Sequence, residues 1–214
     1  EVTISGSKNA ALPIIAASIL NKGKTTLYNV PNIHDTQMMF EILNKIGGKV
    51  TKKNNKVIIE TSKINKYEIP EDLMRQMRSS VIFAGSLVGR YKKATFSYPG
   101  GCDIGTRPID LHLKAFEKLG INIQKNYGNI ICICDKITGE KIDLDFPSVG
   151  ATENAILASC LGEGKTIITN AAREPEIIDL QNFLNKMGAK IKGAGSNKIE
   201  INGVKQLKDV SYNI

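Results

Sequence analysis

The chain repeats one pattern three times, and the clearest copies read EILNKIGGKVTKKNNKVIIE (41–60), KAFEKLGINIQKNYGNIICIC (114–134) and QNFLNKMGAKIKGAGSNKIEI (181–201). Each segment is typical of the end of an amphipathic helix, a glycine C-cap, a strand, a polar turn and a second strand. The capping glycines Gly47, Gly120 and Gly188 are separated by 73 and 68 residues. The 214 residues therefore accommodate three copies of one unit.

A second shared piece lies upstream of each copy: AASILNKGKTTLYNV (16–30), AGSLVGRYKKATFSY (84–98) and LASCLGEGKTIITNA (157–171). Each is typical of a helix of small residues, a glycine-containing break and a strand rich in β-branched or aromatic residues. The helices that begin near Ala10, Ser79 and Glu153 carry small or aliphatic side chains on most faces, which indicates burial. We therefore expect helices inside the molecule and sheets outside.

The alternation of helices and strands predicts an α/β fold with mixed parallel and antiparallel sheets. The pattern predicts a single domain over residues 1–214, with repeats at about 5–62, 72–135 and 146–203. The tail at 204–214 matches no repeat, and we expect it to lead to a further segment. Because the chain begins with Glu1 rather than Met, we also expect a preceding segment.

The composition limits the possible partners. The chain has 29 Lys and Arg against 21 Asp and Glu, a net charge of +8 at pH 7, so an anionic partner is expected. Because the lysines are scattered, Trp is absent and aromatic residues make up 6%, nucleic acid is disfavoured as a partner.

No apolar run reaches the ~20 residues that cross a bilayer, and four cysteines are too few for a disulfide scaffold. We expect a cytoplasmic protein with no membrane or nucleic-acid partner. The alternative is a non-catalytic basic α/β module that binds nucleotides or nucleic acid.

The second copy departs from the others at TFSYPGGCDIGTRPIDLH (95–112), whose glycines and prolines predict a loop around a single thiol, Cys102. Two glycines before Cys102 permit close approach to a ligand, and Arg107 offers a planar fork for phosphate or carboxylate. Cysteines on flexible basic loops are the reactive kind, so Cys102 is the candidate catalytic residue. We interpret the other thiols as packing residues: Cys132, Cys134 and Cys160.

Candidate anion-binding residues lie at the heads of the three buried helices: Lys8 with Asn9, Arg78, and the turn at 148–152. A helix N-terminus offers free amides and the positive end of the helix dipole to an anion. If the three helices run parallel, these ends converge on one anion-favouring surface. His34 and His112 lack metal or triad partners in the sequence, so we interpret both as structural, and we expect no metal or cofactor.

Several stretches together identify a resemblance: SGSKNAALPI, MRSSVIFAGSLVGR, PGGCDIGTRPIDLH, SVGAT and NAAREPEIIDL. They resemble the enolpyruvyl transferases, in the branch that acts on UDP-N-acetylglucosamine. The resemblance implies two similar domains, each an inside-out α/β barrel of three units, of which this chain is the one with the Cys loop. It implies enolpyruvyl transfer from phosphoenolpyruvate to the sugar 3-hydroxyl, with release of phosphate. The family's carboxylate base belongs to the second domain, so we expect this chain alone to be inactive.

The resemblance also implies roles for individual residues. Cys102 would protonate the methylene carbon of phosphoenolpyruvate, and a thiol with a reference pKa of about 8.5 carries a proton near neutrality. Lys8, Arg78 and Arg107 would hold the phosphate and carboxylate of phosphoenolpyruvate, and Asn9 would orient the sugar nucleotide. The segments that contact the nucleotide would be Arg107, Pro108, Ile109, Asp110 and Leu111, and Phe146, Pro147, Ser148, Val149 and Gly150. Phe146 and Ile82 stand where the family has a basic and an aromatic residue.

Overall fold

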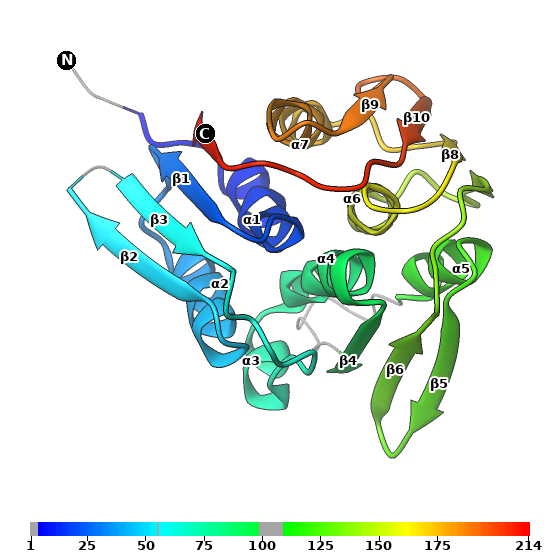
Figure 1. The fold of residues 1–214 in the computed structure, drawn as a ribbon, viewed down its shortest axis with the longest axis horizontal. Helices are drawn as coiled ribbons and strands as arrows, with labels where there is room; N and C mark the ends of the chain where they lie inside the picture. The colour runs from blue at the N-terminus through cyan, green and yellow to red at the C-terminus, as the bar shows by residue number, and fades with distance from the viewer. Residues whose placement is uncertain (1–3, 55, 99–108) are drawn as a thin grey trace.

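The computed structural model describes residues 4–54, 56–98 and 109–214. Within these ranges the helices lie in the interior and the sheets lie around them (Figure 1). Three successive stretches of chain build this arrangement, and each contributes helices followed by a hairpin.

The elements of the three stretches correspond closely. The first contains α1 (Lys8–Ala17), the 3-10 helix η1 (Ser18–Leu20), β1 (Lys24–Tyr28), α2 (His34–Lys45), β2 (Lys49–Lys53) and β3 (Lys56–Glu60). The second contains α3 (Glu71–Gln76), the 3-10 helix η2 (Arg78–Val81), α4 (Ile82–Tyr91), β4 (Lys93–Ser97), α5 (Asp110–Lys118), β5 (Asn122–Asn126) and β6 (Asn129–Ile133). The third contains β7 (Lys141–Asp143), α6 (Val149–Ser159), β8 (Lys165–Thr169), α7 (Pro175–Lys186), β9 (Lys190–Lys192), β10 (Lys198–Asn202) and β11 (Val210–Asn213).

The predicted turn from helix to hairpin occurs in each stretch. Gly47, Gly120 and Gly188 follow α2, α5 and α7 with positive φ angles of 103°, 80° and 104°, a conformation that glycine adopts without steric cost. The strands that follow form antiparallel hairpins, β2 with β3, β5 with β6, and β9 with β10. The upstream strands β1, β4 and β8 pair antiparallel with the second strand of each hairpin.

The tail at the C-terminus corrects one expectation. β11 pairs parallel with β1, with Thr25 opposite Val210. The other two sheets have an equivalent parallel neighbour, because β7 pairs with β8 and Glu68 bridges to Thr95. The expectation that the tail matches no repeat was therefore wrong. It supplies to the first sheet the strand that precedes the second and third repeats, and it lies beside β1 in Figure 1.

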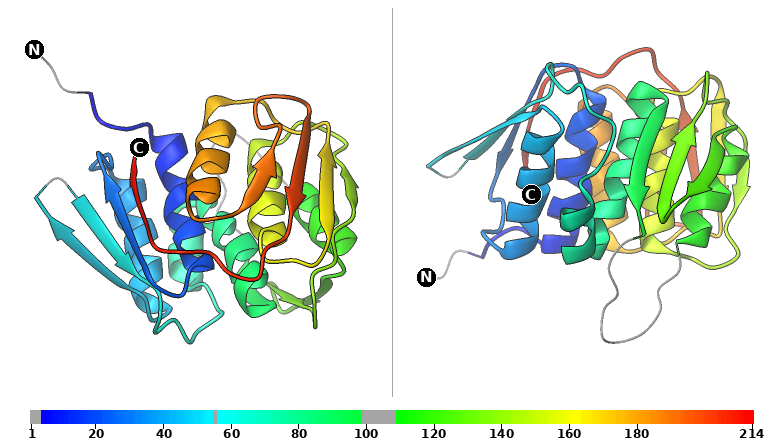
Figure 2. Two further views of the ribbon diagram at one scale, coloured as in Figure 1. Left: turned by 45° about the horizontal axis from the view of Figure 1, so that its top comes forward. Right: turned by 90° about the horizontal axis from the view of Figure 1, so that it is seen from below.

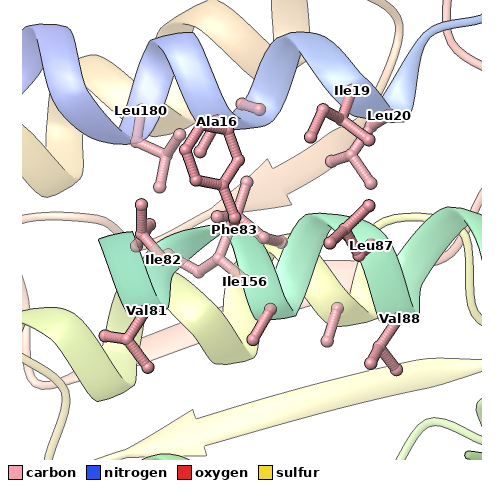
Figure 3. Close-up of a cluster of buried hydrophobic side chains, with 14 of the residues drawn as sticks. Ala16, Ile19, Leu20, Val81, Ile82, Phe83, Leu87, Val88, Ile156 and Leu180 are labelled. Carbon is pink, nitrogen blue, oxygen red and sulfur yellow. The ribbon is translucent and has the colours of Figure 1, made fainter. Parts of the chain in front are cut away.

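The core lies between the helices, as the apolar faces predicted. α1, α4 and α6 lie side by side (Figure 2), and side chains from these helices and α7 interdigitate (Figure 3). Ala16, Phe83, Ile156 and Leu180 in this cluster are fully buried. Burying such helices on all faces explains why they carry few charges.

Two glycines of α4 allow the helices to approach closely. A Cβ atom on Gly85 would lie 2.5 Å from Asn154 Oδ1, and one on Gly89 would lie 2.8 Å from the Leu157 carbonyl oxygen. Gly89 is therefore a packing residue inside α4 and not the expected break before β4. The chain turns at Lys92, whose φ is 61°.

Candidate active site

The heads of the three buried helices meet at one pocket of about 610 Å³. Lys8 and Asn9 contribute from the start of α1, Arg78 from the start of η2, and the 148–150 turn from the start of α6. The repeat predicted this convergence. Because helix N-termini present unpaired amides and positive partial charge, the pocket is suited to an anionic ligand.

Two polar side chains of the pocket, those of Lys8 and Asn9, contact acidic neighbours. Lys8 Nζ lies 2.8 Å from Asp35 Oδ2, and both side chains are partly exposed. The Asn9 side chain donates a hydrogen bond from Nδ2 to Glu176 Oε1 at 3.3 Å. Partly exposed ion pairs of this kind contribute little stability, so a bound anion can compete for Lys8 at small cost.

The start of α6 is shaped by its cap and by Gly150. Ser148 accepts a hydrogen bond from the Ala151 amide, which is a standard N-cap contact. A Cβ atom on Gly150 would lie 3.0 Å from His112 Cε1 and 3.3 Å from Nε2. The glycine therefore allows the His112 imidazole of α5 to lie directly against the first turn of α6.

Two buried titratable groups line the pocket, and sequence reasoning assigned neither to the site. Burial, and then the charge of Arg78, lower the pKa of His112 to about 4. Burial, followed by the charges of Glu176 and Glu174, raises the pKa of Glu153 to about 8. Both groups are therefore neutral at pH 7. Glu153 gave no signal because its short polar stretch, Thr152 to Asn154, matches no known motif and the rest of the helix is apolar. His112, in contrast, directly follows the predicted nucleotide-contacting segment.

The other residues predicted to contact the nucleotide do not line this pocket where the structure describes them. Ile109 is buried and precedes α5, whose first residues are Asp110 and Leu111; none of the three lines the pocket. Phe146 is 65% exposed and, like Pro147, precedes α6 outside the pocket. The remaining predicted residues, Cys102, Arg107 and Pro108, lie outside the described residues.

The described thiols have the properties of packing residues. Cys132 and Cys160 are fully buried, and burial raises the pKa of each to about 12. Burial also raises the pKa of Cys134. These thiols are therefore poor nucleophiles at neutral pH. In the described part of the chain, no cluster of three or more potential ligands could hold a metal ion, and no helix is long and apolar enough to cross a membrane.

Solved structures with the same arrangement are enolpyruvyl transferases. The enolpyruvyl transferase NikO from Streptomyces tendae superposes with a TM-score of 0.85 and 22% sequence identity, over 98% of this chain and 50% of that one. The EPSP synthase from Acinetobacter baumannii superposes with a TM-score of 0.77 and 19% identity, over 100% of this chain and 49% of that one. These likenesses confirm the predicted inside-out α/β barrel.

The sequence comparisons cover the whole chain. Two relatives are a UDP-N-acetylglucosamine 1-carboxyvinyltransferase 2 of Caldanaerobacter subterraneus subsp. tengcongensis, 53% identical, and a UDP-N-acetylglucosamine 1-carboxyvinyltransferase 1 of Carboxydothermus hydrogenoformans, 50% identical. Each alignment covers 100% of this chain and 51% of the relative, so the chain spans about half the length of the curated relatives it matches. A family model described as EPSP synthase (3-phosphoshikimate 1-carboxyvinyltransferase) matches residues 1–214, and the chain therefore belongs to that family of enolpyruvyl transferases.

Proposed function

We propose that this chain is the Cys-loop domain of a UDP-N-acetylglucosamine 1-carboxyvinyltransferase. The complete enzyme would transfer the enolpyruvyl group of phosphoenolpyruvate to the 3-hydroxyl of UDP-N-acetylglucosamine and release phosphate. The observation that carries the proposal is the pocket in which Lys8, Arg78 and the start of α6 converge, in a chain 53% identical to an enzyme of that name.

The chemistry of the pocket supports this assignment. Phosphoenolpyruvate carries a phosphate and a carboxylate, and both groups require cationic side chains and backbone amides. Lys8 and Arg78 would supply the charges within the described pocket, and Arg107 would complete the set from the Cys loop. Asn9 would orient the sugar nucleotide, and the segments at 107–111 and 146–150 would contact its uridine diphosphate.

Cys102 would be the general acid that delivers a proton to the methylene carbon of phosphoenolpyruvate. Because the thiolate is also nucleophilic, the same residue would react with the epoxide fosfomycin. The base for the sugar hydroxyl would come from a second domain, so this chain alone would release no phosphate. In the cell the reaction would be the first committed step of peptidoglycan synthesis, in the cytoplasm, and would support cell-wall growth, cell shape and division.

The test is site-resolved alkylation of this chain by fosfomycin, followed by intact mass measurement and peptide mapping. We expect one adduct at Cys102, formed faster when UDP-N-acetylglucosamine is present. The buried thiols Cys132 and Cys160 serve as internal controls, and Cys102→Asp is the matched variant that retains an acid but gives no adduct. Labelling spread over several thiols, or no response to the sugar nucleotide, would contradict the proposal.

A second assay separates the chain from the complete enzyme. We expect no phosphate release when the chain is incubated with phosphoenolpyruvate and UDP-N-acetylglucosamine. Release should appear when the chain is extended to the full length of its relatives, about twice this length. Turnover by the chain alone would show that it contains its own base.

A further inference from the structure

Asn154 connects three helices directly behind the pocket. It lies in α6, it is fully buried, and its carboxamide contacts α4 and α5. The side chain donates from Nδ2 to the Val81 carbonyl at 3.2 Å and accepts at Oδ1 from the Gly85 amide at 2.8 Å. Val81 and Gly85 are four residues apart, a spacing at which backbone groups bond to each other in a regular α-helix. The Asn154 carboxamide thus bonds to two backbone groups at the junction of η2 and α4.

These two backbone contacts fix the orientation of the amide. The Gly85 amide can only donate, and the Val81 carbonyl can only accept. A flipped carboxamide would place its NH₂ group against the amide and its oxygen against the carbonyl. Nδ2 is therefore the atom that lies 2.7 Å from His112 Nδ1.

The contact with Nδ2 determines which nitrogen of His112 carries the proton. Because Nδ2 can only donate, Nδ1 of His112 must accept, and the proton of a neutral imidazole lies on Nε2. His112 lines the pocket, and its Nε2 and Cε1 atoms lie against Gly150 at the head of α6. The partner at Nδ1 thus directs the N–H group toward the anion-favouring end of the helices.

We propose that Asn154 is a positioning residue that holds His112 in the Nε2–H tautomer, so that His112 presents a neutral N–H donor to an anionic oxygen bound in the pocket. Burial and the positive charge of Arg78 oppose a second proton on the ring, whereas the carboxylate of Asp110 in α5 favours one. Glu153 of α6 lines the same pocket and is itself held neutral by burial. The identity of the natural ligand rests on the proposed function, whereas the tautomer does not.

The first test is nitrogen NMR of the chain labelled at histidine. The chain has two histidines, and the exposed His34 serves as an internal reference. At pH 7 we expect His112 to show an unprotonated Nδ1 and a protonated Nε2. A protonated Nδ1 on His112 would overturn the proposal, and the wild-type spectrum alone decides this.

A substitution of the partner tests its control over the ring. In Asn154→Asp a carboxylate oxygen replaces the donor, so we expect the proton to move to Nδ1 and the pKa of His112 to rise by about 2 units. The spectrum of His34 should not change. An Asn154→Asp variant that folds and keeps the Nε2–H tautomer would overturn the positioning role.

Two variants of His112 test the donor. In His112→Gln the amide NH₂ group can replace Nε2–H, whereas in His112→Asn the shorter side chain reaches only the Nδ1 position. We expect His112→Asn to weaken binding of inorganic phosphate and of UDP-N-acetylglucosamine about tenfold or more, and His112→Gln to lose less. Equal affinities in wild type and both variants would overturn the donor role. If the chain binds inorganic phosphate but does not bind UDP-N-acetylglucosamine, and the variants weaken phosphate binding as expected, the result would support the donor role of His112 and contradict the proposed function.

Discussion

Glu153 illustrates how one residue depends on its surroundings. It is the fifth residue of α6, where burial and two neighbouring carboxylates favour the protonated form of its carboxyl group. The same carboxyl on a surface helix would be ionised at neutral pH. In the pocket it adds a neutral polar group to a lining that also contains Lys8 and Arg78.

The raised pKa of Glu153 predicts a pH-dependent stability. The folded state holds this proton up to about pH 8, whereas the unfolded chain releases it near pH 4.3. Between these values the folded state binds more protons, so the free energy of unfolding falls as pH rises. We expect Glu153→Gln to stabilise the chain at pH 8.5 relative to pH 5, on the order of 2–4 kcal/mol. Urea unfolding at both pH values measures this difference.

The exposed Glu117 of α5 provides the matched control for that experiment. Glu117→Gln should change the free energy of unfolding by the same small amount at pH 5 and pH 8.5. If Glu153→Gln behaves like Glu117→Gln, the carboxyl of Glu153 is ionised in the folded state.

At the scale of elements, close packing of α4 against α6 builds the back wall of the pocket. Gly85 allows the α4 backbone to approach the Asn154 carboxamide. The neighbouring Ser86 is fully buried, and its hydroxyl has no hydrogen-bond partner among the described residues. Adjacent positions of one helix therefore respond to alanine in opposite ways.

We expect Gly85→Ala to destabilise the chain and Ser86→Ala to stabilise it. Alanine improves helix propensity by about 1 kcal/mol, but a Cβ atom at Gly85 would lie 2.5 Å from Asn154 Oδ1 and 2.7 Å from its backbone oxygen. Overpacking of this kind costs about 1–3 kcal/mol, which outweighs the gain. Ser86→Ala removes an unpaired buried hydroxyl, worth about 1 kcal/mol or more. Chemical denaturation of both variants tests the pair.

The turn of the β5–β6 hairpin gives a second prediction at this scale. Tyr127 and Gly128 form its two-residue turn, with φ angles of 45° and 81°. Tyr127 is 99% exposed, so its side chain contributes little packing. We expect Tyr127→Asn to raise the free energy of unfolding by about 0.5–1 kcal/mol, because asparagine tolerates this conformation. Tyr127→Val should lower it, since β-branched residues resist positive φ, and equal unfolding midpoints for the two variants would contradict the argument.

At the scale of the whole molecule, the C-terminal tail closes the first sheet. Asp209 accepts hydrogen bonds from the Asn21 side chain at 2.7 Å and the Lys24 amide at 2.8 Å, just before β11 joins β1. Leu207 and Val210 are buried in the same segment. The first and last parts of the chain are therefore bound together around the helices.

We expect a chain that ends at Gly203 to be less stable than the full chain by about 3 kcal/mol or more. The loss corresponds to exposure of Leu207 and Val210, each worth about 1.5–3 kcal/mol, and of the free edge of β1. Asp209→Asn, which keeps β11 but weakens its charged anchor, should cost less. Thermal and urea unfolding of the two variants rank these effects, and an unchanged midpoint for the shortened chain would show that β11 adds no stability.

The sequence by itself determined the repeated unit, its glycine turns and the burial of three helices. It also determined that Lys8, Arg78 and the 148–150 turn lie at the N-terminal ends of those helices. These features are local, because helix period, capping and hairpin turns are set by residues a few positions apart. Their convergence followed from the repeat, since equivalent helices run in the same direction.

Only the tertiary structure decided which distant residues meet. β11 pairs with β1, although the paired residues Thr25 and Val210 are 185 positions apart, and Asn154 contacts His112 from 42 positions away. The pKa of Glu153 is raised by burial and by carboxylates of α7 and its N-cap. No local pattern encodes such contacts, because pairing between strands and burial of polar groups depend on how complete elements pack. The physical reason is that a residue's hydrogen-bond partners and its desolvation depend on its neighbours in space. The repeat predicts how the elements are arranged, but it does not predict which individual side chains come into contact.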